Sequence, residues 1–194
     1  MIETIFIILI LCFIIIFKYL NHNDVCFVET FDSKSYLVRN LPDKNDAAKM
    51  LGEIREKLLN FINKLVNELE EFSDEEYYSY IKMIQKRLPH SIIKESSANS
   101  EYTSYSINKG EELVFCLRSK QTNQLHDLND ILYVAIHEIA HIGCPEIGHT
   151  PLFKKINLFL LEKAINYNLY NYENYRKNNK EYCGLILTSN IIDK

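Results

Sequence analysis

The feature that most constrains this chain is the pentapeptide His137–His141, which reads His-Glu-Ile-Ala-His and has the form H-E-x-x-H. Apolar periodicity predicts that it lies on a helix from Leu128 to about Ile142, with Asp127 as the N-cap. Histidines four residues apart on a helix share one face, so both imidazoles can reach one Zn²⁺ ion. Glu138 stands beside them, where its carboxylate is suited to take a proton from a metal-bound water.

This helix is predicted to stop shortly after its second histidine. Gly143 is expected to take a left-handed C-terminal cap, and Pro145 cannot continue a helix. His149 follows the break, directly before a further helix that is predicted to start with Thr150 as N-cap and Pro151. Because a catalytic zinc site has three protein ligands and one position open for water, His149 is the predicted third ligand.

Other side chains stay open as the third ligand. Glu146 lies in the break and Glu162 on the helix that follows, and each offers a carboxylate. Cys144 offers a thiolate, although the interpretation we favour for it is a small buried or turn cysteine. In an interpretation without metal, His137 and His141 are ordinary helical histidines.

The first twenty residues are nearly all apolar, and residues 4–17 carry no charge. Fourteen helical residues span about 21 Å, short of the roughly 30 Å hydrocarbon core, and the flanks bring the segment close to a minimal span. We expect residues 1–20 to be a single-pass N-terminal transmembrane helix that meets the membrane through residues 4–20. Glu3 before it and Lys18 after it favour a cytosolic body. The alternatives are a cleaved signal peptide, which would make the protein secreted, and a buried core helix.

The rest of the chain, residues 21–194, is predicted to be one α+β domain with a small antiparallel sheet and packed helices. A long helix is expected after Asp43, because apolar residues recur there at spacings of three and four. The second helix opens with a capping box at Ser73 and ends at Pro89. The predicted strands are Val25–Thr30, Ser35–Arg39, Tyr102–Asn108 and Glu112–Arg118, the last two forming a β-hairpin.

The cysteine count indicates the redox compartment, and the net charge indicates which class of partner to expect. The five cysteines are odd in number and contain no C-x-x-C, so we expect reduced thiols in a reducing compartment rather than a disulfide framework. The chain has 22 basic and 26 acidic residues, a net charge of −4 and no long basic run. No nucleic acid is therefore expected as a partner.

The stretch HEIAHIGCPEIGHTPLF resembles the active-site segment of the WLM and SprT-like zinc metallopeptidases. In that group an H-E-x-x-H helix is followed by a turn, a third histidine and a phenylalanine, which correspond here to His149 and Phe153. The pieces SYSINKGEELVFCLR and EYCGLI are similar to uncharacterised WLM-like proteins of large DNA viruses. The resemblance implies a zincin-like fold, Zn²⁺ as cofactor and a protein or peptide substrate. The seven residues between His141 and His149 exceed the spacing of familiar WLM members.

We therefore expect a membrane-anchored zinc metallopeptidase in which Glu138 is the catalytic residue. Tyr182, Tyr105 and Arg118 are the candidates for stabilising the oxyanion, and the hairpin strand before the active-site helix offers an edge to an extended peptide. The alternative function is a catalytically inactive zinc-binding interaction module at a membrane. A third is a small structural membrane protein without metal.

Overall fold

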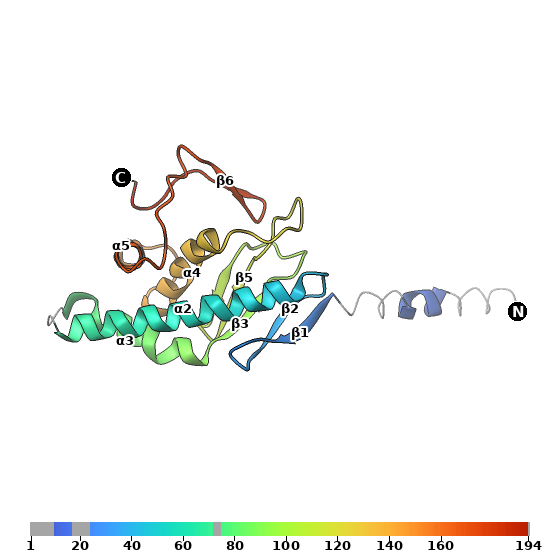
Figure 1. Cartoon of the computed structure of the whole chain (residues 1–194), viewed down its shortest axis with the longest axis horizontal. Coiled ribbons are helices and arrows are strands. Elements are labelled where there is room, and N and C mark those ends of the chain that lie inside the picture. The colour runs from blue at the N-terminus through green and yellow to red at the C-terminus, as the bar shows by residue number, and fades with distance from the viewer. Residues whose placement is uncertain (1–9, 17–23, 72–74, 194) are drawn as a thin grey trace, which may run out of the picture.

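A computed structural model describes residues 10–16, 24–71 and 75–193 of the chain (Figure 1). Its strands and helices follow one another as β1 (Val25–Glu29), β2 (Ser35–Arg39), α2 (Lys44–Glu71), α3 (Glu75–Arg87), a 3₁₀ helix (Leu88–His90), β3 (Ile92–Glu95), β4 (Tyr105–Ile107), β5 (Glu112–Phe115), α4 (Leu128–Gly143), α5 (Pro151–Asn166), β6 (Lys180–Tyr182) and β7 (Leu185–Leu187). The predicted α+β class is confirmed.

The main sheet has five strands in the order β1-β2-β3-β5-β4. Its two outer pairs, β1 with β2 and β4 with β5, are antiparallel, and the second of them is the predicted hairpin. The prediction of an antiparallel sheet is wrong for the centre, because β3 runs parallel to both β2 and β5. Parallel neighbours need a long crossover, which α2 and α3 supply between β2 and β3.

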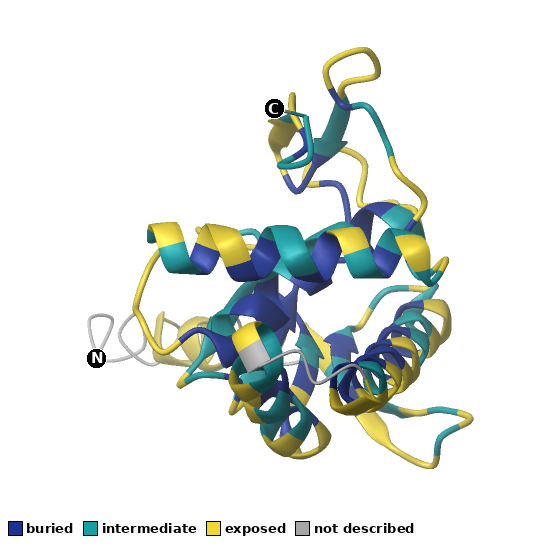
Figure 2. Cartoon of the chain, turned by 90° about the vertical axis from the view of Figure 1, so that its left-hand side faces the viewer, coloured by how far each residue is buried: buried dark blue, intermediate teal, exposed yellow. Residues whose placement is uncertain are grey.

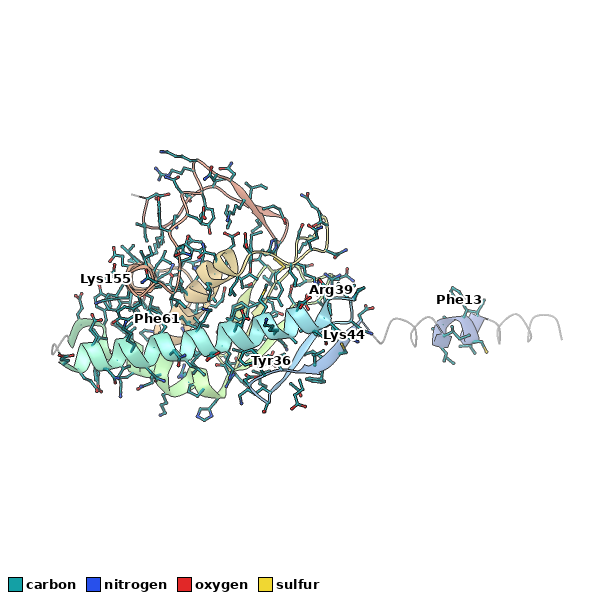
Figure 3. The ribbon with its side chains drawn as sticks, in the orientation of Figure 1. Phe13, Tyr36, Arg39, Lys44, Phe61 and Lys155 are labelled. Atoms are coloured by element: carbon teal, nitrogen blue, oxygen red, sulfur yellow. A yellow bond between two sulfur atoms is a disulfide. The ribbon has the colours of Figure 1, made fainter. Side chains whose placement is uncertain are left out.

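Helix α2 runs along the sheet and holds much of the core. The apolar residues whose spacing predicted this helix are all buried, namely Leu51, Ile54, Leu58, Phe61, Ile62, Leu65 and Leu69. Figure 2 shows the same pattern along the helices, with buried residues on the sides turned toward the body and exposed residues outside. Phe61, labelled in Figure 3, meets the ring of Tyr167 edge-on at 5.9 Å, which ties α2 to the end of α5.

The helix ends differ in part from the predictions. Thr150 caps α5 as expected, because its Oγ1 accepts a hydrogen bond of 3.2 Å from the Phe153 N–H. Helix α4 begins at Leu128 as predicted, but the Asp127 side chain makes no capping hydrogen bond. The left-handed cap predicted for Gly143 is wrong, since Gly143 is the last helical residue of α4.

Gly143 is needed for a different reason. A Cβ at this position would lie 2.9 Å from the Tyr80 carbonyl oxygen and 3.0 Å from the Ile84 side chain, both on α3. The glycine thus permits a close approach of α3 and α4, a contact between distant parts of the chain. Helix α3 itself ends at Arg87 and continues through Pro89 as a 3₁₀ turn, while Ser73 of the predicted capping box lies outside the described residues.

A disulfide joins Cys116 to Cys183, so the expectation of reduced cysteines is wrong for this pair. Cys12, Cys26 and Cys144 are free. The bond closes a loop of 67 residues, for which loop-closure entropy gives about 4 kcal/mol of stabilisation. It fastens the C-terminal hairpin of β6 and β7 to the residue that follows β5.

The N-terminal segment is described only in its middle. Residues 10–16 are helical, and their side chains are exposed. Within residues 10–16, 24–71 and 75–193, no helix combines the length and the apolar character that crossing a membrane requires. The remainder of the predicted anchor, residues 1–9 and 17–20, lies outside the described residues. The division into residues 1–20 and 21–194 stays a prediction.

Candidate metal centre

Helix α4 places His137 and His141 on one face, one turn apart, as the H-E-x-x-H spacing predicted. His149 approaches them from the loop that precedes α5. One ligand atom from each of the three imidazoles lies within 4.8 Å of the other two. The Nε2 atoms of His137 and His149 are 3.0 Å apart. The structure therefore brings together the three histidines that were predicted as ligands.

Residues of helix α5 pack against this histidine cluster. The Phe153 ring stacks on His141 at a centroid distance of 4.0 Å and meets His137 edge-on at 4.9 Å. Asn157 is buried one turn further along, with its Nδ2 atom 3.4 Å from the Nδ1 atom of His137. Such outer partners orient a histidine so that its other nitrogen points at the metal. Because Thr150 caps α5, this N-cap sets the start of the helix that carries Phe153 and Asn157.

The cluster favours uncharged imidazoles. Burial lowers the pKa of His137 to about 3, with further lowering by the neighbouring His141 and His149. Burial likewise lowers the pKa of His141 to about 4, helped by His149 and by the ammonium group of Lys109. A histidine binds metal in its neutral form, so His137 and His141 are in the ligating form at neutral pH.

Glu138 is almost fully buried beside the cluster, with 4% of its surface exposed. Burial raises its pKa to about 7, and a hydrogen bond from the Ser106 backbone N–H acts in the opposite direction. A carboxyl group with a pKa near neutrality is suited to accept and return protons. Its carboxylate does not belong to the group of ligand atoms formed by the three histidines.

The donor set fits zinc. Catalytic zinc sites take three protein ligands and keep one position for water or substrate, and three imidazole nitrogens from a helix and the loop that follows it match that ligand set. The other candidates for the third ligand, Glu146, Glu162 and Cys144, do not join the histidine group within the described residues.

A cleft of about 750 Å³ opens over the histidines and Glu138. One wall comes from the edge strand β4 and its flanks, through Thr103, Ser104, Tyr105, Ser106, Asn108 and Lys109. Another is the C-terminal hairpin, through Tyr182, Leu185 and Leu187, and a third contribution comes from the loop at Ile147. The cleft is therefore bounded by segments that only the tertiary fold brings together.

Of the three residues predicted as candidates for stabilising the oxyanion, two lie in the cleft and one lies elsewhere. Tyr105 and Tyr182 line the cleft. Burial raises the pKa of Tyr182, so its hydroxyl is a proton donor at neutral pH, and it lies 2.8 Å from the Ser104 hydroxyl. Arg118 does not line this cleft. It is buried with Glu95 at 2.8 Å and also pairs with Asp43, which makes it part of a structural ion cluster.

Two contributors to the site were not identified from the sequence. Asn157 follows Phe153 by four residues on α5, so the helical spacing alone was a usable signal. Lys109 had no such signal, because its partners lie 35 and 37 residues later in the chain.

The chain has relatives among the proteins of large DNA viruses. No known family's sequence profile matches the chain. The chain is 40% identical over 160 residues to uncharacterized protein R325 of Acanthamoeba polyphaga mimivirus, a match that covers 82% of this chain and 80% of that protein. It is 30% identical over 121 residues to uncharacterized protein 042R of Invertebrate iridescent virus 3, covering 62% of this chain and 65% of that protein. The expected kinship with proteins of large DNA viruses is confirmed.

Solved structures of Wss1 also resemble the chain. Wss1 from Saccharomyces cerevisiae aligns with a TM-score of 0.46 and 18% identity, covering 68% of this chain and 88% of that one. A Wss1 mutant from S. pombe aligns with a TM-score of 0.43 and 18% identity, covering 66% and 92%.

Proposed function

The chain belongs to the family of large-DNA-virus proteins that includes R325 of mimivirus, and we propose that it is a zinc-dependent metallopeptidase that hydrolyses protein or peptide substrates. One observation carries the proposal: three histidines that are candidate metal ligands and one buried carboxylate line the same cleft. The ligands are His137, His141 and His149, and the carboxylate is Glu138.

The roles of these residues follow from their chemistry. When bound, Zn²⁺ polarises the scissile carbonyl and makes water a stronger acid. The Glu138 carboxylate accepts a proton from the attacking water and delivers it to the nitrogen of the leaving amine. The burial that raises the pKa of Glu138 to about 7 suits both transfers. The Phe153 and Asn157 contacts hold the ligands in place during these steps.

The position of β4 supports a peptide substrate. This strand is at the edge of the five-stranded sheet, where it pairs with β5 on one side and lines the cleft with Tyr105 and Ser106. Backbone groups on the outer side of an edge strand can pair with an extended peptide, and on β4 one of them, the Ser106 N–H, is held by Glu138. The cleft that a peptide bound in this way would occupy is also lined by the three histidines. Tyr105 and Tyr182 are then within the cleft as hydroxyl donors for the oxyanion.

The proposal includes attachment to a membrane. Its support is the uncharged apolar run at residues 4–17, together with the exposed apolar side chains of residues 10–16. The full chain is expected in the membrane fraction of expressing cells after an alkaline wash, and a variant without residues 1–20 is expected in the supernatant. Equal distribution of the two proteins would contradict the anchor and leave the peptidase proposal untouched.

Removal of the metal tests the peptidase proposal. The purified full chain is expected to cleave an unstructured, fluorescently labelled protein, to lose that activity after dialysis against a chelator, and to regain it with about one equivalent of Zn²⁺. Cleavage that persists in the zinc-free protein would show a contaminant or another mechanism. If the zinc-loaded protein cleaves nothing, the alternative of a zinc-binding interaction module takes precedence.

A further inference from the structure

His149, the predicted third ligand, lies on an exposed loop. Residues 145–149 connect α4 to the cap of α5, and all five are exposed. Ile147 is 89% exposed, and Gly148 has a positive φ of 82°. His137 and His141, by contrast, are held by the backbone of α4. The geometry of the metal site therefore depends on what holds this loop in place.

Lys109 contacts the loop directly. Its Nζ donates one hydrogen bond of 2.6 Å to the Cys144 carbonyl oxygen and another of 2.5 Å to the Glu146 carbonyl oxygen. Hydrogen bonds from a charged donor are about twice as strong as neutral ones. The ammonium group also lies at the C-terminal end of α4, where the helix dipole favours a cation. One side chain thus fixes two carbonyls two residues apart, just before His149.

The backbone of Lys109 lies in a tight turn that packs against α4. It belongs to the turn between β4 and β5, in which Asn108 and Lys109 have φ values of 48° and 57°. Gly110 follows with a φ of 93°, and a Cβ there would lie 2.6 Å from the Ile142 side chain. The turn is therefore pressed against the last turn of α4. From this position Lys109 connects the sheet to the ligand loop.

We propose that Lys109 is a positioning residue for the metal site, which holds the loop so that His149 closes on His137 and His141. The inference rests on the zinc site of the proposed function, although it does not require peptide hydrolysis. Without the two hydrogen bonds, zinc binding must also order the loop, and that ordering lowers the affinity. Outer partners of metal ligands typically contribute about 10-fold to 100-fold in affinity.

The test compares zinc affinities of full-length variants. Competition with a chromophoric chelator measures the Zn²⁺ dissociation constant of the wild type, Lys109→Met, Lys109→Arg and Lys57→Met. Lys109→Met keeps the aliphatic length and removes the donors, so its affinity is expected to fall about 10-fold or more. Lys109→Arg keeps a cationic donor and is expected to retain most of the affinity. Lys57, exposed on α2, is the matched control and is expected to change nothing.

A double-mutant cycle separates positioning from a general loss of structure. If Lys109 acts through His149, Lys109→Met weakens zinc binding in the wild type but not in a His149→Ala background. Equal weakening in both backgrounds, or an unchanged affinity in Lys109→Met, would overturn the inference while the proposed function stands. A wild-type chain that binds no zinc would overturn the proposed function first. Equal melting temperatures of the metal-free proteins confirm that the variants fold.

Discussion

Replacing Glu138 with glutamine is expected to lower kcat/KM for peptide hydrolysis about 1,000-fold and to leave zinc binding unchanged. Glutamine matches the shape of the carboxylic acid but accepts no proton at neutral pH, so the attacking water loses its general base. Glu138 is buried beside the ligands without joining them, which is why the metal is expected to stay. The removal of a buried carboxyl with a raised pKa is also expected to leave the fold intact.

The experiment measures hydrolysis and zinc content in the same preparations. Glu162→Gln is the matched control, because Glu162 is exposed on α5 and lies outside the histidine group. The control is expected to keep both activity and zinc, which also excludes Glu162 as a ligand. Hydrolysis by Glu138→Gln at the wild-type rate would remove Glu138 from the mechanism. Unchanged biological activity in a hydrolytically dead Glu138→Gln protein would favour the interaction-module function.

Replacing His149 with alanine is expected to weaken zinc binding by more than about 100-fold, because even an outer partner of a ligand contributes up to that amount. The two remaining histidines of α4 form an incomplete site, since catalytic zinc takes three protein ligands. Equilibrium competition with a chelator measures the change. His90→Ala is the control, because His90 is exposed on the 3₁₀ turn and is expected to have no effect.

The outcome of His149→Ala bears on the unusual spacing of the site. Seven residues separate His141 from His149, and the structure closes this gap by folding the loop back over α4. An affinity equal to that of the wild type would mean that another group completes the site, and His149 would then be a helix-start residue only. The role of His149 as a ligand is supported if the variant loses zinc and keeps its folded structure. Thermal melting of the metal-free protein monitors the folded structure.

The parts of the fold that the sequence predicted correctly depend on local patterns. The face of α2, the start of α4 at Leu128 and the cap at Thr150 each follow from residues within about one or two turns. The spacing of His137 and His141 belongs to the same class, because a helix converts a four-residue separation into a shared face.

The parts that were missed depend on contacts between distant residues. Strand β3 has four residues, and its parallel pairing with β2 arises only after α2 and α3 have crossed the sheet. The Cys116–Cys183 bond joins residues 67 apart, and no spacing rule for cysteines predicts it. Gly143 was assigned to a helix cap, whereas its neighbour in space is the Tyr80 backbone. Lys109 reaches its loop through the fold in the same way.

The zinc content of the purified, dialysed full-length chain tests the central claim most directly. Elemental analysis is expected to find about one zinc ion per wild-type chain and a large loss in His149→Ala. A wild-type content below about a tenth of an equivalent after zinc loading would contradict the account, because the three histidines would then hold no metal and Glu138 would have no activated water to act on.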